Sequence, residues 1–258
     1  MKFIVLGSGT TVPHPERSSS AYWLETARGG TLLLDCSAPA IYRVTQEGLD
    51  WPNLDAVWIS HFHFDHCGGL APFLSGTKHA PQMKTREKPL KIFGGPGLRK
   101  LLDNFDAVNN YRLFEQPFPV EVIEIGQLEK FEILPSVEAV AFSTPHTPES
   151  HALRLFDGDG KTLVYTADTG FGLARELAAF SRDADLLVIE ASYPKDKPVE
   201  KHLELEESMY IIRKAAPKRA VLTHLYQVWD EVDGDAEIAK FGPECEVMQA
   251  YDGLRLEI

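Results

Sequence analysis

Cysteine is scarce in this chain, which has only three among its 258 residues: Cys36, Cys67 and Cys245. They are widely separated, so the sequence contains neither a C-x-x-C pair nor an even disulfide framework. This cysteine content fits a reducing compartment best, and cytoplasmic localisation is expected. Cys67 adjoins His66 and is expected to be a small buried thiol rather than a ligand.

The sequence also lacks any apolar run long enough to cross a membrane. Its first residues, Met1–Gly7, predict a strand followed by a glycine turn rather than the apolar segment of a signal peptide. We therefore expect no membrane partner.

Positive charge is in deficit, with 26 Lys and Arg against 38 Asp and Glu and a formal net charge of −12. Binding of RNA draws heavily on phosphate contacts from Lys and Arg, often gathered into a basic face. The densest basic region, Lys78–Lys100, is more typical of a solvated loop than of a nucleic-acid groove. A small-molecule phosphodiester or ester is therefore the expected partner, and nucleic acid is not.

Length and composition predict one domain over residues 1–258, because 44% of the residues are hydrophobic and no repeat, low-complexity tract or linker occurs. Pro81–Pro89 is expected to be a mobile loop. Apolar alternation and short apolar runs predict strands, and helical spacing predicts helices. The main expected strands are Phe3–Val12, Ala21–Thr26, Thr31–Leu34, Glu121–Ile125, Lys130–Leu134, Val137–Phe142, Leu186–Glu190, Ala220–Thr223 and Val247–Ile258. The expected helices are Gly68–Leu74, Gly97–Phe105, Leu173–Phe180 and Leu205–Ala216.

The stretch from His61 to His66 carries the strongest chemical signal. His61, His63, Asp65 and His66 follow Ala56–Ile59, an apolar run that predicts a buried strand. Neutral imidazoles and carboxylates are ligands that borderline divalent metals accept. A surface histidine cluster or an expression tag is the alternative, but a tag is terminal and unbroken. The stretch therefore predicts a metal site in a loop at the end of a strand.

The pattern H-x-H-x-D-H after a strand resembles the metallo-β-lactamase superfamily. This resemblance implies a four-layer αββα sandwich, an α/β fold that holds one or two metals between its halves. The family pattern calls for a later His, Asp and His in that order. His146, Asp168 and His224 each follow a strand-like run and match those positions. Alone, Asp168 in Asp-Thr-Gly would be taken for a turn residue.

The resemblance also implies how two divalent ions would be shared. His61, His63 and His146 would hold one ion, Asp65, His66 and His224 the other, and Asp168 would bridge both. Two such ions can share a water, lower its pKa and supply a metal-bound hydroxide. Zinc is the metal expected, although manganese or iron would suit the same ligands. Asp35 is expected either to hydrogen-bond a ligand histidine or simply to end a strand.

Within the superfamily, the chain resembles ribonuclease Z and its relatives over nearly its whole length. The matching segments are Val5–Arg17, Leu34–Cys36, Ile92–Leu98 and Ile189–Tyr193. In that family a glutamate orients a histidine that donates a proton to the leaving oxygen, and Glu190 and His202 match these residues. His202 could instead be a surface residue at a helix start. Asp65, Glu190 and His202 are the candidate catalytic residues.

Two departures from ribonuclease Z bear on the substrate. Glu204 stands where that family usually has Ser or Thr, and a carboxylate there favours a helix start. Only 22 positions separate His146 from Asp168, which leaves room for a hairpin but not for the long arm with which ribonuclease Z grips transfer RNA. The arm is expected to be missing.

We therefore expect a dinuclear-metal phosphodiesterase acting on small or cyclic phosphodiesters. The alternatives are a lactonase or thioester hydrolase of the same superfamily, or a 3′ transfer-RNA-processing endonuclease. A non-enzymatic binding module ranks last, because such a protein would be expected to have lost a ligand. A homodimer is implied only by the resemblance.

Overall fold

Two seven-stranded sheets face each other in the computed structural model, which describes residues 1–258. The first sheet has the order β14-β1-β2-β3-β4-β5-β6. Strands β3 to β6 are parallel, and the remaining pairs are antiparallel. Its strands are β1 (Lys2–Gly7), β2 (Ala21–Glu25), β3 (Thr31–Leu34), β4 (Ala56–Ile59), β5 (Leu90–Gly94), β6 (Val120–Glu124) and β14 (Arg255–Glu257).

The second sheet has the order β13-β12-β11-β10-β9-β8-β7. Here β10 to β13 are parallel, and β7 to β10 pair antiparallel. Its strands are β7 (Lys130–Leu134), β8 (Val137–Ser143), β9 (His151–Asp157), β10 (Thr162–Tyr165), β11 (Leu186–Glu190), β12 (Arg219–Thr223) and β13 (Glu246–Gln249).

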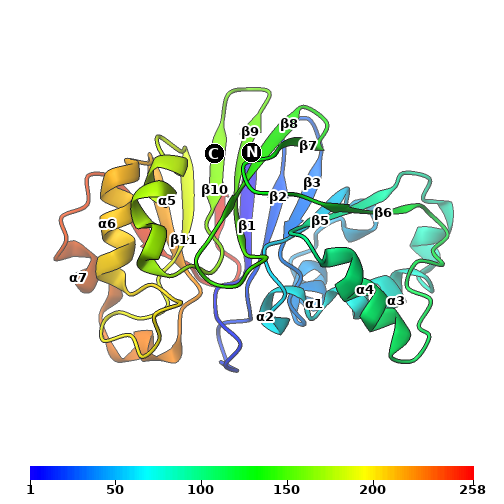
Figure 1. Cartoon of the computed structure of the whole chain (residues 1–258), viewed down its shortest axis with the longest axis horizontal. Helices are drawn as coiled ribbons and strands as arrows, with labels where there is room; N and C mark the ends of the chain where they lie inside the picture. Colours follow the sequence, from blue (N-terminus) through cyan, green and yellow to red (C-terminus); the bar gives the residue numbers. More distant parts are fainter.

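Helices cover the outer faces of both sheets, which gives four layers (Figure 1). The first sheet carries α1 (Ala40–Gln46), α2 (Phe64–Cys67), α3 (Leu70–Thr77) and α4 (Leu98–Ala107), and the second carries α5 (Ala174–Phe180), α6 (Leu205–Ala215) and α7 (Gly234–Ala239). Short 3₁₀ helices are η1 (Trp51–Asn53), η2 (Pro81–Thr85), η3 (Phe171–Leu173) and η4 (Gln227–Glu231). The predicted αββα sandwich is confirmed. None of the helices combines the length and apolarity needed to span a bilayer.

The alternation of side chains in the strands divides the core into layers. In β1, Phe3 and Val5 join the cluster that contains buried residues of both sheets, whereas Ile4 and Leu6 join the cluster that contains α3 and α4 residues. Successive strand residues point to opposite faces, so an uninterrupted apolar run suits a strand covered on both sides. Burial on both faces holds the strands in place, and with them the strand ends that the predicted ligand residues follow.

The expected final strand Val247–Ile258 is wrong, because the segment forms two strands in different sheets. The chain turns between them at Gly253, whose φ of 95° favours glycine, and the Asp252 carboxylate accepts hydrogen bonds from the backbone of Ser8 and Ser18. Strand β1 also ends earlier than expected, at Gly7.

The segment Pro81–Pro89, expected to be a mobile loop, instead contains η2 and a buried arginine. The Arg86 guanidinium donates hydrogen bonds to the backbone carbonyls of Pro52, Leu54, Lys88 and Pro89 at 2.8–2.9 Å. These contacts anchor the segment to η1 and to the start of β5.

Candidate metal centre

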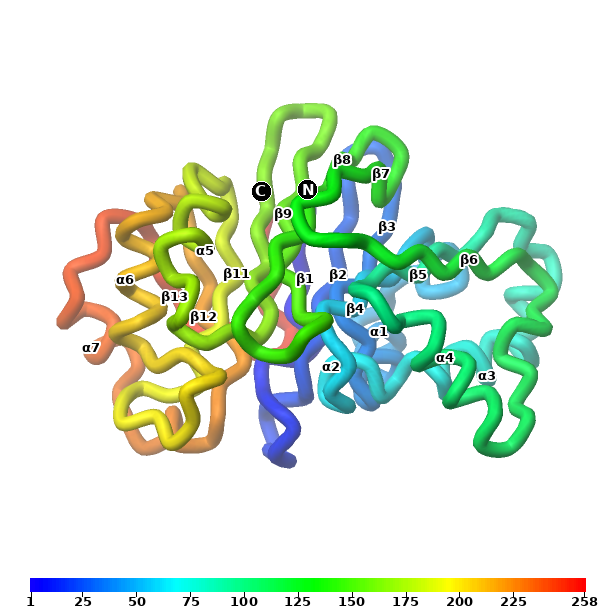
Figure 2. Tube along the Cα trace, in the orientation of Figure 1, coloured from blue at the N-terminus to red at the C-terminus, as the bar shows by residue number.

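The polar residues predicted as ligands follow the ends of four strands. His61 and His63 lie between the end of β4 and α2, and Asp65 and His66 lie within α2. His146, Asp168 and His224 follow β8, β10 and β12. In Figure 2 the green segment after β8 reaches the cyan segment around α2, where His146 Nε2 lies 3.1 Å from His63 Nδ1. Residues far apart in the chain thus meet at one edge of the sandwich.

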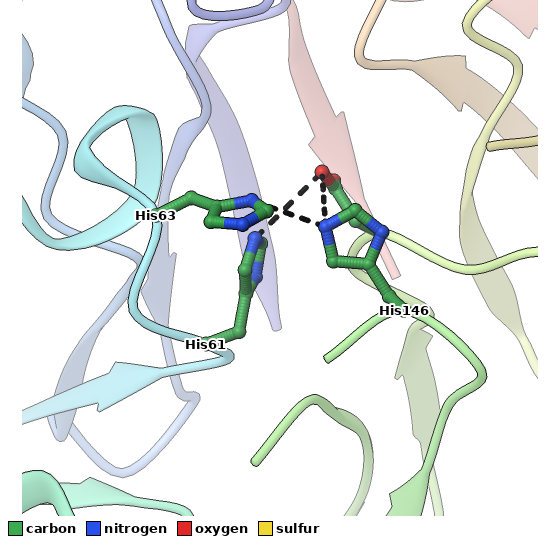
Figure 3. Close-up of side chains that lie close together, drawn as sticks. His61, His63 and His146 are labelled. Carbon is green, nitrogen blue, oxygen red and sulfur yellow. Dashed lines mark hydrogen bonds and ion pairs between the residues drawn. The ribbon is translucent and has the colours of Figure 1, made fainter. Parts of the chain in front are cut away.

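One group of donors comprises His61, His63, His146 and Asp168, whose candidate ligand atoms all lie within 4.8 Å of one another. Figure 3 shows the three imidazoles converging on one point. Asp168 Oδ2 lies 3.8 Å from His61 Nε2 and 3.7 Å from His146 Nε2. This spacing leaves room for a cation between the atoms.

A second group comprises Asp65, His66 and His224. Asp65 Oδ2 lies 3.5 Å from His224 Nε2 and 3.8 Å from His66 Nε2. Asp168 reaches this group as well, at 3.3 Å from each of the two imidazoles. Asp168 therefore stands between both groups, and all seven predicted ligands are brought together.

The residues present fit divalent metal ions. Nε2 of His61, His66 and His224 is buried and has no hydrogen-bond partner. An unpaired buried polar atom is costly, and most such atoms in proteins have a partner. In this centre three such atoms face carboxylates. A cation coordinated by the imidazoles and the carboxylates would account for them.

Neighbouring groups hold Nδ1 of three candidate ligand histidines, His66, His146 and His224. His66 Nδ1 lies 2.7 Å from Asp35 Oδ2, His146 Nδ1 donates to the Lys201 carbonyl at 2.9 Å, and His224 Nδ1 lies 2.9 Å from Ser192 Oγ. Such partners fix the tautomer and orientation of a ligand ring. The predicted contact of Asp35 with a histidine of the cluster is confirmed. Asp35 also accepts hydrogen bonds from Ser60 and Tyr165.

Three non-glycine residues around the centre have left-handed backbone conformations: Asp35 with φ 58°, Ala167 with φ 51° and His224 with φ 57°. Each directly follows a strand or lies one residue from a candidate ligand. This conformation is disfavoured for residues with a side chain, and surrounding structure has to maintain it. Two of these residues place their side chains in the cluster, where Asp35 contacts His66 and His224 contacts Asp168.

Electrostatics favour the ligand-competent protonation states at two key positions. Burial and the neighbouring His66 hold the pKa of His61 well below its usual range. Burial opposes ionisation of Asp168, yet His224 and His66 hold the pKa of its carboxyl well below the ordinary value. A neutral imidazole and an ionised carboxylate are the forms that bind metal.

His202 and Glu190 lie in contact beside the centre. His202 Nδ1 is 3.0 Å from Glu190 Oε1, and the His202 ring centroid is 5.0 Å from that of His146. Burial lowers the pKa of His202, but the hydrogen bond and charge of Glu190 outweigh it and raise the pKa to about 9. The predicted pairing is present, and the His202 side chain is 13% exposed, so solvent or substrate can reach it.

Glu190 does more than the sequence indicated. Its carboxylate also accepts hydrogen bonds from the backbone of Thr169 at 3.0 Å and of Leu203 at 2.5 Å, and from Ser192 Oγ at 3.2 Å. Thr169 follows Asp168, and Ser192 contacts His224. Glu190 therefore connects His202 to two candidate ligands, to Asp168 through the adjacent Thr169 backbone and to His224 through Ser192. Ser192 was visible in the motif, but its link to His224 depends on the tertiary fold.

Other residues near the cluster take structural positions. His151 is buried in β9 and contacts the Glu149 carbonyl and Ser143 Oγ, as expected of a strand residue. Thr147 and Ser150 hydrogen-bond each other through their hydroxyls at 2.6 Å. The Asp65 and His202 side chains are 9% and 13% exposed.

Comparison with known proteins gives consistent similarities. A family model described as a β-lactamase superfamily domain matches residues 31–225. Ribonuclease Z of Ignicoccus hospitalis is 25% identical over 273 residues, covering 86% of this chain and 87% of that protein. The probable metallo-hydrolase YhfI of Bacillus subtilis is 26% identical, covering 94% and 98%.

Solved structures show the same fold. The crystal structure of YhfI covers 100% of this chain and 98% of that chain, with a TM-score of 0.81 and 24% identity. A diphosphatase from the PhnP family covers 100% and 97%, with a TM-score of 0.74 and 20% identity. At these identities the structural likeness is one of fold.

Proposed function

The chain belongs to the metallo-β-lactamase superfamily and is a metal-dependent hydrolase, and from this premise we propose that it hydrolyses small or cyclic phosphodiesters. The observation that carries the proposal is the His202–Glu190 pair beside the candidate metal centre, at 3.0 Å. A histidine held by a carboxylate can donate a proton to an oxygen leaving group. A phosphodiester with an alkoxide leaving group needs such a donor.

The residues that would hold two divalent ions are those predicted. His61, His63 and His146 would bind one ion, Asp65, His66 and His224 the other, with Asp168 between them. Such ions lower the pKa of a water molecule and neutralise charge developing on a phosphoryl oxygen. The three unpaired buried Nε2 atoms support this assignment.

His202 would act as the general acid. Its Nδ1 is held by Glu190, so Nε2 is the ring nitrogen left to face the substrate. As the bond from phosphorus to the leaving oxygen breaks, the Nε2 proton moves to that oxygen and the imidazole becomes neutral. Glu190 stabilises the protonated ring before the transfer.

The hairpin between His146 and Asp168 supports a small substrate. Strands β9 and β10 pair with each other from Leu153, which lies opposite Tyr165, to Phe156, which lies opposite Thr162. The connection between them around Gly160 is short. Nothing in this interval extends as an arm that could grip a large RNA. The net charge of −12 also opposes binding of a polyanion.

The deciding experiment compares reaction classes at one enzyme concentration with zinc or manganese added. The panel contains bis-p-nitrophenyl phosphate, 2′,3′-cyclic AMP, a γ-lactone and an acyl thioester. We expect the two phosphodiesters to be hydrolysed well above the lactone and thioester. Preferential hydrolysis of the lactone or thioester would contradict the proposal and assign carbonyl chemistry to the centre.

A 3′ transfer-RNA-processing endonuclease is the second candidate. It is favoured by ribonuclease Z of Ignicoccus hospitalis, with which this chain aligns over 87% of that protein's length. The short hairpin and the acidic charge make it the weaker candidate.

A further inference from the structure

The loop between β11 and α6, residues 191–204, carries His202 and contains no helix. We propose that Lys197 is a positioning residue for His202, holding its backbone so that the imidazole meets the leaving oxygen. This inference rests on the proposed role of His202 as general acid. It assigns a function to a lysine that contacts neither the candidate ligands nor Glu190.

The Lys197 ammonium group has a defined set of partners. Nζ donates a hydrogen bond to the His202 carbonyl at 3.1 Å and lies 2.8 and 2.7 Å from the two carboxylate oxygens of Glu207. The side chain is only 9% exposed, whereas surface lysines usually extend into water. The Lys197 charge is shielded from solvent and is paired with both carboxylate oxygens of Glu207. The contact of Lys197 with His202 is therefore not a transient surface interaction.

Glu207 is itself fixed by the start of α6. Glu204 and Glu207 form a reciprocal capping box, in which the Glu207 carboxylate accepts the Glu204 backbone N–H at 3.1 Å. The Lys197 backbone N–H donates to Glu204 Oε2 at 3.2 Å. Glu204, the residue that departs from the ribonuclease Z pattern, therefore caps α6, and Glu207 of this helix binds Lys197.

His202 is consequently restrained from two directions. Glu190 holds the ring through Nδ1 and the next backbone N–H, at Leu203. Lys197 binds the His202 carbonyl, which belongs to the same peptide bond as the Leu203 N–H and points the opposite way. Without Lys197, this peptide keeps the Glu190 contact at its N–H but loses the side-chain contact at its carbonyl. A misplacement of about 1 Å can cost roughly 10²-fold in rate.

The test compares Lys197→Met with Lys195→Met, which removes the same charge from an exposed position in the same loop. Both are measured with zinc-loaded protein on 2′,3′-cyclic AMP, which has an alkoxide leaving group, and on bis-p-nitrophenyl phosphate, whose anion leaves readily. Metal content and thermal midpoint are recorded for each variant.

We expect Lys197→Met to lower kcat on the cyclic nucleotide by roughly 10- to 100-fold and to change the nitrophenyl ester by less than about threefold. Lys195→Met should match the parent protein on both. Lys197→Arg should recover part of the loss, since it keeps the cation. Adding Lys197→Met to His202→Ala should cause no further loss, because the residue being positioned is already gone.

Equal losses on both substrates, or an additive double variant, would overturn the positioning role. If His202→Ala shows the leaving-group dependence and Lys197→Met does not, this inference fails while the proposed function stands. If His202→Ala shows no leaving-group dependence, the acid role and this inference both fall.

Discussion

Glu190 accepts hydrogen bonds from four groups, and its surroundings determine what a substitution does. Glu190→Gln replaces one acceptor oxygen by an amide NH₂ group, which donates. This NH₂ group would face one of two pairs of present donors, either His202 Nδ1 and Thr169 N–H or Ser192 Oγ and Leu203 N–H. We expect about 10- to 100-fold weaker metal binding as well as lower turnover. Isothermal titration with zinc measures this, and Glu206→Gln, which changes an exposed glutamate in the first turn of α6, is the matched control. Unchanged zinc affinity would limit Glu190 to His202.

His63 tests the metal centre itself, because it is exposed and its removal should leave the fold intact. Its Nδ1 lies 3.1 Å from His146 Nε2. We expect His63→Ala to abolish phosphodiester turnover and to lower the metal content measured by mass spectrometry. The exposed His79 lies outside the cluster, so His79→Ala should keep both. Full activity in metal-free His63→Ala protein would refute the centre.

At this scale the sequence predicted the residues of the cluster but not their supports. His61 to His66 form a compact motif, and His146, Asp168 and His224 follow strand-like runs in the order that the family resemblance implies. The Lys201 carbonyl, Ser192 and Tyr165 make contacts with residues 32 to 130 positions away in the chain, one of them through a backbone atom. No local pattern encodes such contacts.

Among the elements, Arg86 is the structural anchor of the segment after α3. Its guanidinium satisfies four backbone carbonyls, so Arg86→Met would leave several of them unpaired. We expect a loss of about 2–4 kcal/mol in the free energy of unfolding. Urea denaturation measures this. Lys84→Met in the exposed part of the same segment should change stability by less than about 0.5 kcal/mol.

Asp185 joins β10 to the segment before β12 and should make stability depend on pH. It accepts hydrogen bonds from Thr162 N–H at 2.8 Å and from Lys218 Nζ at 2.7 Å. Burial opposes ionisation, but Lys218 and Thr162 lower the pKa of Asp185 below its usual value. A carboxyl with a lowered folded pKa contributes stability above its unfolded pKa, and this is lost as pH falls through the folded pKa.

Asp185→Asn should therefore cost about 1–2 kcal/mol at pH 7, where solvent screens the exposed Lys218 and limits its share. The difference from the parent protein should shrink below about pH 4, as the parent carboxyl becomes protonated. Urea melts across this range measure it. A difference that stays constant with pH would show that the carboxylate charge contributes nothing.

The elements themselves were largely predictable where burial dominates. Strands such as Thr31–Leu34, Lys130–Leu134 and Leu186–Glu190 match their expected bounds, because uninterrupted or alternating apolar residues suit the sheets. The short helices α1 and α7 were not expected, and α2 begins inside the histidine stretch. The division of Val247–Ile258 depends on Asp252 binding the distant Ser8, which the local pattern does not show.

At the scale of the whole molecule, the distribution of charge matters more than its sum. Burial and ion pairing take up part of the positive charge in the basic segment Lys78–Lys100. Arg86 is buried, Lys88 pairs with Asp55 at 2.7 Å, and Arg99 pairs with Asp103 at 2.9 Å. Lys78, Lys84, Lys91 and Lys100 have no acidic partner, so pairing and burial reduce, without removing, the positive charge that this segment offers to the phosphates of a large RNA.

A comparison of kcat/KM for 2′,3′-cyclic AMP and for a precursor transfer RNA separates hydrolysis of a small phosphodiester from RNA processing. Both are assayed with the same zinc-loaded protein at about 0.15 M salt, and His63→Ala provides the background. We expect the cyclic phosphodiester to be hydrolysed at the histidine centre and 3′ processing of the RNA to be slow or absent. Efficient 3′ processing of the precursor, with the cyclic nucleotide left intact, would contradict this expectation.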